Sequence, residues 1–539
     1  MTSVTFKQFS GSTPRVAPHL LGASTAAEAL DCKLWHGTLQ SWREPLLVHS
    51  TPEGTVTSLL YDCCWLDFDT CVDFAYGPVT CRQLFTTGYE DWPAIHEFGE
   101  DCAPSVHRLG LPCPTGAPSV FASGTAAEKD TEGRSYAYQY RNADADRSAL
   151  SRASQAVLVR DGQTVVVSGW DVPDTSWGVV DVLIYRSVSG HQSGREPGNV
   201  LDTTWMLVGS APVGAASFTD TKFNDELLNA LQEDVASPPP ADLRGIVHIA
   251  SMNSLAGFVG NKLYFSENNS YHHWPYTFTL DDNICAIVEA NGMIYVATDG
   301  RPYVITGAVD CKTAGCREVV RLPGHYPMTG CGNRRMAATP NGAVYPSHEG
   351  LISLSGTAQP TVLTHPLYAP DDWHQMPPES VIPAVHNGKL FVFGRRKSFV
   401  LTLPGGPEQG WQMDTHSELS DTDVLDAFTS RTGDFYLLKA DGVYQWDRGA
   451  RYRPHRWVSP VAVTPTPVNF GAAHLVQANG AENVTIRLDG RQVFNRSVLS
   501  TREFTLPNWA LGTRWQVVLE GTAVVSLFSI ASSMKELGA

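Results

Sequence analysis

Three pairs of neighbouring acids are the first residues whose type and spacing could do chemistry: Asp67 and Asp69, Asp281 and Asp282, and Asp371 and Asp372. Glycoside hydrolysis needs two carboxyl groups on opposite sides of a cleft. Acids this close together in loops are far more often solvated turn residues. The chain contains no HExxH, no GxSxG, no Walker loop and no Ser-x-Asp-x-Gly-x-Thr-Trp repeat of the sialidase type. We therefore expect no enzyme and no catalytic or cofactor-binding residues.

Histidines and cysteines raise the question of a metal site. His272 and His273 are adjacent, and adjacent side chains of an extended segment point to opposite faces, so we expect them to pack rather than to share a metal. A structural zinc site usually shows two tight cysteine pairs, whereas the pairs here are Cys63-Cys64 and Cys311-x4-Cys316. We expect no metal and mostly free, buried thiols among the eleven cysteines: Cys32, Cys63, Cys64, Cys71, Cys81, Cys102, Cys113, Cys285, Cys311, Cys316 and Cys331.

Two basic clusters interrupt an acidic chain: Arg395-Arg396-Lys397, and the group Arg448, Arg451, Arg453 and Arg456. Either cluster could contact DNA phosphates. In a chain this acidic we prefer pairing with acidic neighbours in an oligomer.

The composition of the chain indicates which secondary-structure elements hold these acidic, basic, histidine and cysteine residues. Of 539 residues 42% are hydrophobic and only 17% are charged, with 46 glycines and 35 prolines, which fits many short strands joined by tight turns. The net charge of −16 argues against a basic nucleic-acid-gripping face. The acidity either keeps the protein in solution or lines a bore through which DNA slides without sticking. We expect no signal peptide, no membrane-spanning segment and synthesis in a reducing cytosol.

The first half of the chain divides at two proline-rich segments. Residues 1–115 show few clear strands and end in a connector, Leu109 to Pro114. Residues 116–225 predict a β-sandwich of the immunoglobulin or fibronectin type, with alternation at Tyr136–Tyr140, an apolar strand at 182–186 and a hairpin turn at Asp161-Gly162. Asp220 to Val235 predict one amphipathic helical segment, and residues 226–240 predict a linker that ends in the triple proline at 238–240.

An internal repeat follows the prolines. A tight-turn dipeptide precedes a short apolar-aromatic strand five times, at Gly260-Asn261, Asn291-Gly292, Asn341-Gly342, Asn387-Gly388 and Gly433-Asp434. The last four are spaced by 50, 46 and 46 residues, a period typical of β-propeller blades. Second turns follow at Asp299-Gly300, Glu349-Gly350 and Asp441-Gly442. We predict an irregular propeller over 241–456 and a C-terminal β-sandwich over 457–539, hence a mainly β protein.

Several ordered segments resemble the tail nozzle, or tail tubular B, proteins of podovirus-type bacteriophages. The resemblance begins at Phe9–Pro14 and continues through Trp65–Phe68 and Leu109–Pro114. Its strongest stretch runs from Pro238–Gly245 through Ala256–Asn261 and Leu263–Glu267 to Trp274-Pro275. It continues in Thr298–Tyr303 and Thr306-Gly307 and ends at Ala531–Leu537.

The resemblance implies a virion structural protein, made in the host cytoplasm and assembled as a ring, expected to be a homohexamer. Residues 1–115 would then contribute to the nozzle body. The ring would lie below the portal and adaptor, contact tail-fibre or tail-tip proteins, and pass the genome through its axis during ejection. Two alternatives stay open: a carbohydrate-degrading tail protein and a receptor-binding tail protein.

Overall fold

The computed structural model describes residues 3–77, 83–99, 102–126, 131–160, 162–189, 203–227, 229–231, 236–306, 317–330, 332–402, 413–416, 424–507 and 511–537. The chain is mainly β, as predicted. Among the described residues the α-helices are α1 (Pro370–His374) and α2 (Met534–Leu537). The chain divides into two compact units: unit 1 is Met1–Cys71, Asp282–Gly307 and Glu318–Ala539, and unit 2 is Val72–Asp281 and Ala308–Arg317.

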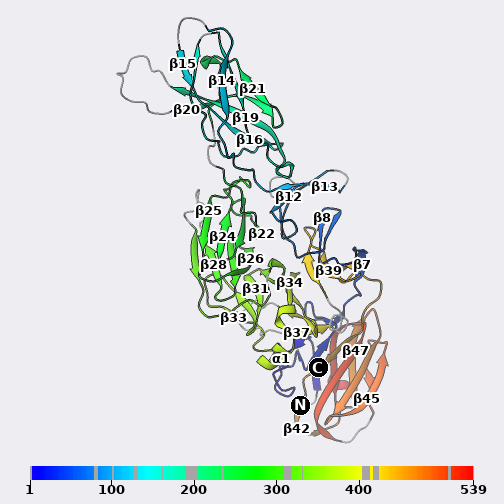
Figure 1. Ribbon diagram of the computed structural model, residues 1–539. Coiled ribbons are helices and arrows are strands. Elements are labelled where there is room, and N and C mark those ends of the chain that lie inside the picture. The colour runs from blue at the N-terminus through cyan, green and yellow to red at the C-terminus, as the bar shows by residue number, and fades with distance from the viewer. Residues whose placement is uncertain are drawn as a thin grey trace. The chain divides into compact units, whose positions relative to one another are not determined.

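Antiparallel four-stranded sheets are the recurring element (Figure 1). Unit 2 contains β10 to β13 (Asp73–Tyr76, Gln83–Thr87, Ala94–Phe98, Pro104–Arg108) and β22 to β25 (Arg244–Ile249, Ser254–Val259, Lys262–Phe265, Tyr276–Thr279). Unit 1 contains β26 to β29 (Ile284–Ala290, Met293–Thr298, Tyr303–Thr306, Glu318–Arg321) and β30 to β33 (Ala337–Thr339, Gly342–Ser347, Gly350–Leu354, Thr361–Val362). It also contains β34 to β37 (Ile382–His386, Lys389–Phe393, Ser398–Thr402, Met413–His416) and β38 to β40 (Asp426–Thr429, Phe435–Lys439, Gly442–Gln445).

The predicted repeat turns are confirmed. Each of the five dipeptides lies at the connection between two consecutive strands of one sheet: the second and third strands in the earliest sheet, and the first and second in the other four. At Asn341-Gly342 the turn is one residue earlier than predicted, because Gly342 begins β31 and pairs with Thr339. Asn291 and Asn387 adopt φ of 55° and 48°, the left-handed conformation that a two-residue type I′ hairpin requires. The second turns join β27–β28, β31–β32 and β39–β40.

Strands inside these sheets are buried on both faces, which explains why their apolar runs do not alternate with polar residues. In β35, Leu390 and Val392 enter a core shared with β30 to β32, whereas Phe391 and Phe393 enter a core shared with β38 and β39. Successive side chains of a strand point to opposite faces, so one strand supplies two cores. The sheets of unit 1 therefore stack face to face along the chain.

The N-terminal region holds more strands than the sequence predicts, and several complete sheets formed by the C-terminal half of the chain. In unit 1, β1 (Ser3–Phe6) pairs with β48 (Val524–Ala531), and β4 (Glu28–Leu30) lies between β37 and β41 (His455–Val458). The edge of the β38–β40 sheet is filled by β7 (Leu46–His49). The remaining short strands are β2 (Ser10–Ser12), β3 (Thr25–Ala26), β5 (Cys32–Lys33), β6 (Gln40–Ser41), β8 (Thr57–Tyr61) and β9 (Cys64–Phe68).

The last part of unit 1 has two sheets around one core. One contains β1, β48, β43 (Ala472–Ala478) and β46 (Phe504–Thr505). The other is formed by β41, β42 (Ala462–Val468), β47 (Gly512–Gly521), β44 (Glu482–Leu488) and β45 (Arg491–Val498). These five strands belong to a twelve-stranded sheet that continues through β4 into β34 to β37 and also includes β2 and β3. Their shared core includes Trp457, Trp515 and Phe528.

The insert within unit 2 also packs two three-stranded sheets on one core. One has the order β14 (Ser119–Ser123), β18 (Thr164–Ser168) and β21 (Ser217–Asp220), and the other β16 (Tyr136–Asn142), β19 (Val179–Ser189) and β20 (Thr203–Pro212). A separate pair joins β15 (Thr131–Arg134) to β17 (Val157–Arg160). Strands β17 and β18 do not pair with each other as the hairpin predicted at Asp161-Gly162 requires, because β17 pairs with β15 and β18 with β14. The Gln163 N–H donates to the Arg160 carbonyl oxygen at 3.0 Å, and Asp161 itself lies outside the described residues. Tyr136–Tyr140 is buried on both faces rather than on one.

Three regularly spaced serines cover the open edge of β16 without forming a strand. Ser148, Ser151 and Ser154 each donate a backbone N–H to the carbonyl oxygen of Tyr140, Tyr138 or Tyr136, at 2.8–3.0 Å. Each serine Oγ accepts the N–H of the same tyrosine at 2.9 Å and donates to the next carbonyl along its own segment. Ser266 and Ser459 repeat this arrangement with Leu255 and Val517. At the edge of the sheet these N–H groups have no neighbouring strand to bond to, and the serine hydroxyls accept them instead. Buried backbone N–H groups need such a partner.

The predicted helix between 220 and 235 is also wrong. Its described part has a single 3₁₀ turn, η2 (Asn224–Glu226), and then runs extended beside β20, where Ala230 bridges to Met206. Leu207 N–H donates to Asn229 and Leu231 N–H to Trp205. Pairing with β20 satisfies these groups, and Leu227 is buried in the core of the insert.

Candidate functional site

A line of serine, histidine and glutamate lies in unit 1, although no sequence motif marks any of the three. The Ser41 hydroxyl lies 2.9 Å from His455 Nδ1, and His455 Nε2 lies 3.0 Å from a Glu482 carboxylate oxygen. Ser41 lies in β6, His455 in β41 and Glu482 in β44. Ser41 and His455 are more than 400 positions apart along the chain. Hydrolases use such a series of hydrogen bonds to activate a serine.

The burial of these three side chains shows that their hydrogen bonds hold β6, β41 and β44 together and do not expose a nucleophile. Ser41 is 5% exposed, and His455 and Glu482 are 0% exposed. The Ser41 hydroxyl also lies 3.2 Å from the Gly521 carbonyl oxygen, to which it donates. A nucleophile must reach a substrate, whereas this hydroxyl is enclosed. Burial raises the pKa of Glu482, although its hydrogen bond to His455 opposes that shift.

A cavity in unit 2 is lined by acidic, basic, amide and aromatic side chains together. It has a volume of about 290 Å³. One wall is the face of the β10–β13 sheet, where Gln83 lies opposite Glu97 and Phe85 lies opposite Ile95 in the antiparallel register. The other walls are a turn after β16, the end of the 3₁₀ helix η1 (Thr175–Trp177), and the loop before β25. They contribute Asn142, Ala143, Asp144, Asp146, Trp177, Gly178, Asn269, Tyr271 and His272.

Two carboxyl groups meet in this cavity and share a hydrogen bond. The amide of Gln83 donates to both, at 3.3 Å from Glu97 and 3.2 Å from Asp144. Burial raises the pKa of Glu97, and the hydrogen bond and negative charge of Asp144 raise it further. Glu97 therefore holds a proton more readily than a solvent-exposed glutamate does.

A third carboxylate lies beside a predicted histidine. Asp146 is 3.3 Å from His272 Nδ1 and accepts the side-chain amide of Asn142 at 3.1 Å. Burial alone would raise the pKa of Asp146, but the hydrogen bond and attraction from His272, with help from Asn142, hold it below its usual value. His273 turns elsewhere and accepts the Ser237 N–H at 2.9 Å, so the two histidines face different partners, as predicted.

Aromatic rings form the apolar part of the same cavity. Tyr271 lies against Phe85, with ring centroids 5.4 Å apart, and its hydroxyl donates to Asn253 at 2.9 Å. The Arg108 guanidinium lies 5.0 Å from the ring centroid of Trp177 and 5.4 Å from the ring centroid of Trp92. The cavity thus combines apolar ring surfaces with groups that donate and groups that accept hydrogen bonds.

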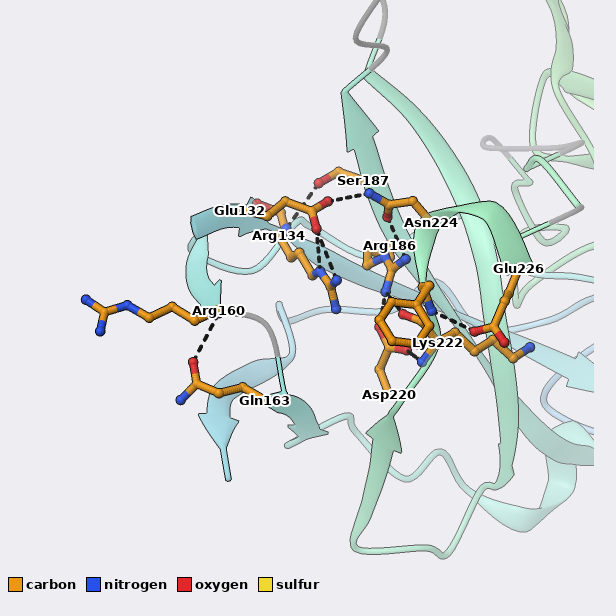
Figure 2. Close-up of polar contacts among 12 residues, drawn as sticks. Glu132, Arg134, Arg160, Gln163, Arg186, Ser187, Asp220, Lys222, Asn224 and Glu226 are labelled. Carbon is orange, nitrogen blue, oxygen red and sulfur yellow. Dashed lines mark hydrogen bonds and ion pairs between the residues drawn. The ribbon is translucent and has the colours of Figure 1, made fainter. Parts of the chain in front are cut away.

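A second groove, of about 280 Å³, lies on the insert between β15, β17 and residues 221–223. Figure 2 shows Arg134 beside Glu132, which accepts two bonds from its guanidinium at 3.0 and 3.1 Å. The Arg160 side chain points away from Arg134 and Asp220 (Figure 2). Because Arg134 is already matched by a carboxylate and Arg160 does not converge on it, the groove lacks a focused positive charge for an anion.

A buried ion pair lies beneath this groove. Arg186 and Asp220 are 2.6 Å apart and both side chains are fully buried (Figure 2). Asp220 also accepts the Tyr136 hydroxyl at 2.7 Å, and Asn224 accepts from Arg186 at 2.7 Å while donating to Glu132 at 2.8 Å. These bonds join β15, β16, β19, β21 and η2, so the network is a fold support.

The neighbouring acids that the sequence offers as possible catalytic groups have different structural roles. Asp67 lies in β9, where it accepts from Ser58 at 2.7 Å and pairs with His49 at 2.8 Å, so for this residue the solvated-turn interpretation is wrong. Asp282 accepts the Arg301 N–H and the Tyr303 hydroxyl. Asp371 and Asp372 lie in the first turn of α1, where a negative charge is favourable.

Most of the second basic cluster is neutralised within the chain. Arg448 pairs with Asp434, Arg453 with Asp31, and Arg456 with both Glu28 and Glu520. In the first cluster, Lys397 lies 5.2 Å from the Tyr368 ring, and burial lowers its pKa. Pairing in an oligomer is therefore unnecessary for Arg448, Arg453 and Arg456.

Cysteine states are mixed among the described residues. Cys32, Cys63, Cys71, Cys113 and Cys285 are free thiols, but only Cys32 and Cys285 of these are buried. Cys64 and Cys102 are disulfide-bonded. Cys81, Cys311, Cys316 and Cys331 lie outside the described residues, so the Cys311-x4-Cys316 spacing stays untested.

No family model and no curated protein matches the chain. Among solved structures, it is similar to BamB from Moraxella catarrhalis, at 10% identity and a TM-score of 0.31 over 77% of this chain and 98% of that one. A streptogramin B lyase structure gives 8% identity and a TM-score of 0.31 over 76% and 97%. Sqt1 from Saccharomyces cerevisiae gives 12% identity and a TM-score of 0.26 over 75% and 98%. Likeness at this level carries no conclusion about what the chain does.

Proposed function

We propose that this chain is a structural subunit of a short bacteriophage tail. In this proposal it forms a ring-shaped nozzle below the portal and adaptor, expected to be a homohexamer, and the genome leaves through the axial channel. The protein acts as a rigid support and not as an enzyme. The family resemblance of the ordered sequence segments first directs attention to this function.

The observation that carries the proposal is the position of the N-terminal strands in unit 1. Strands β1, β4 and β7 each complete a sheet whose other strands come from the C-terminal half of the chain. An end of unit 1 cannot open without breaking these ladders, because the first strands are hydrogen-bonded to the last. Such closure suits a subunit that must keep its shape while DNA passes.

We infer further that the stacked four-stranded sheets are blades of an irregular β-propeller, with the insert and the C-terminal sheets as two β-sandwiches. Support comes from the shared cores, in which β31 and β35 each supply opposite faces to two neighbouring sheets. Each such sheet has an apolar face that only a neighbouring sheet can cover, as in propeller blades.

A ring also accounts for the charge of the chain. The net charge of −16 disfavours tight binding of DNA, and an acidic bore lets phosphates pass without adhesion. Rings of identical subunits close through heterologous interfaces, in which two different patches of the same chain meet. Adaptor, tail-fibre and tail-tip proteins are the expected neighbours in the virion.

Two measurements on virions test the proposal. Mass spectrometry of purified particles is expected to find this chain, and native mass determination with electron microscopy of the assembled protein is expected to find a ring with an axial hole. Absence of the chain from virions, or a monomer under conditions in which tails assemble, would exclude the nozzle function.

A further inference from the structure

The cavity in unit 2 between β11, β12 and the turn after β16 has no role in the proposed ring. Its floor is buried, with Phe85 and Leu109 below 4% exposure, whereas Asp144 and Asn269 at its rim are exposed. A ligand can therefore enter from solvent and contact apolar surface below. The volume of about 290 Å³ is near the lower end of small-molecule sites, enough for one ring-sized ligand.

The lining of the cavity carries charged groups of both signs. An anion would meet the carboxyl groups of Glu97, Asp144 and Asp146. A cation would meet Arg108, whose guanidinium is held in the lining by Trp177 and Trp92. A ligand that both donates and accepts hydrogen bonds, without a net charge, avoids both conflicts.

Hydroxyl groups have this property, and the lining is arranged to use it. Asp144 lies at the exposed rim and Glu97 behind it, and both are held in place by the Gln83 amide. Carboxylate and amide groups on one side can accept from and donate to adjacent hydroxyls. Trp177 and Tyr271 contribute aromatic surface to the lining, and the C–H surface of a sugar can pack against such surface.

We propose that this cavity binds one neutral sugar unit, with Asp144, Glu97 and Gln83 contacting its hydroxyls and Trp177 contacting its apolar face. The proposal gives specific residues to a carbohydrate-recognition role. It does not depend on ring assembly. A virion ring that binds no sugar would contradict this inference alone, and a sugar-binding monomer absent from virions would contradict the nozzle alone.

The test is saturation-transfer NMR on the full chain with glucose, galactose and N-acetylglucosamine, each as the free sugar and as its methyl glycoside. A ligand of this size is expected to bind with a Kd in the millimolar range. Binding of methyl glycosides identifies a sugar unit within a polymer, whereas binding of the free sugars alone identifies a small-molecule ligand. Either result supports the site.

Variants locate the binding. Asp144→Asn keeps the size of an exposed side chain but replaces one acceptor by a donor, and it is expected to weaken binding at least tenfold, as is Trp177→Ala. Gln163→Ala, in the second groove of the insert, is the matched control and is expected to bind like the parent chain. No saturation transfer from any sugar at about tenfold above the expected Kd, or equal binding by Asp144→Asn, overturns the proposal.

Discussion

At the scale of single residues, the same side-chain chemistry has different consequences when its burial differs. Ser41, His455 and Glu482 have the bonding order of a hydrolase site but are enclosed. Glu97 and Asp144 form no known catalytic pattern, yet they face a cavity that solvent reaches. Exposure, more than residue type, separates a support from a candidate site in this protein.

Asp414 is a residue at which burial predicts a measurable pH dependence. Its carboxylate accepts the Cys32 N–H at 3.0 Å and the Trp42 indole N–H at 3.3 Å. Burial, reinforced by the negative charge of Asp31, raises its pKa well above the usual value. The folded chain thus keeps a proton that the unfolded chain releases, so the stabilising contribution is complete below about pH 4 and is lost as the pH rises through the folded-state pKa.

We therefore expect the free energy of unfolding of the parent chain, relative to Asp414→Asn, to fall as the pH rises from about 4 to the folded-state pKa of Asp414. The fall is about 1.4 kcal/mol for each pH unit that separates the unfolded-state pKa from the folded-state pKa. Urea unfolding at several pH values measures it. Asp371→Asn, an exposed acid of α1, is the control and should show no such trend. A difference that grows with pH would contradict the buried, protonated state of Asp414.

Sequence reasoning found part of the cavity and missed the rest for a physical reason. His272 stands out because it adjoins His273, but its partner Asp146 lies 126 positions earlier in a turn with no motif. Glu97 and Gln83 are unremarkable along the chain and become neighbours only through the β11–β12 register. Long-range pairing brings these groups together, and a single sequence does not encode that pairing as a local pattern.

At the scale of elements, turns were predictable and edge strands were not. The Asn-Gly and Asp-Gly dipeptides specify their hairpins locally, and all five repeats have a turn at the predicted dipeptide or within one residue of it. Strands β1, β4 and β7 have three or four residues each and pair with partners more than 350 positions away. The helix predicted from Leu227 and Leu231 failed because pairing with β20 satisfies the backbone better than an isolated short helix would.

Gly442 tests whether β7 is essential to its sheet. It has φ of 152°, and a Cβ there would lie 2.5 Å from the His49 carbonyl oxygen and 2.7 Å from Leu47 Cδ1. Gly442→Ala is expected to displace β7 and to destabilise unit 1 by about 1–3 kcal/mol, with faster hydrogen exchange at the Val443 and Tyr444 amides. Gly388→Ala is the control, because its Cβ meets nothing within 4 Å and only the turn is strained. Equal protection of β40 in both variants would contradict this role.

The serine bonds along β16 give a prediction for the insert. Ser151→Ala removes the acceptor for the Tyr138 N–H in a buried setting, at a cost of about 1–3 kcal/mol. Chemical unfolding monitored by the tyrosines of the insert measures this change. Ser217→Ala, at an exposed position of β21, is expected to change stability by less than about 0.5 kcal/mol. A neutral Ser151→Ala would show that water or a neighbour replaces the hydroxyl.

At the scale of the whole molecule, the division into two compact units predicts how the chain unfolds. Each unit has its own buried clusters: those around Trp515, Leu390 and Tyr345 belong to unit 1, and those around Tyr138 and Phe85 belong to unit 2. Units with separate cores unfold as separate cooperative transitions, because a two-state description holds for a domain and not for a multidomain chain.

Scanning calorimetry is therefore expected to resolve two transitions, and the two variants above should assign them. Gly442→Ala, in unit 1, should lower the midpoint temperature of one transition only. Ser151→Ala, in unit 2, should lower the midpoint temperature of the other only. A loss of about 1 kcal/mol shifts the midpoint of a domain of roughly 150–250 residues, the size class of unit 2, by about 2–4 °C, and that of the larger unit 1 by less. If both variants lower the same transition, the two units unfold as one. A nozzle subunit would then derive its rigidity from the whole chain and not from the N-terminal strands that complete unit 1.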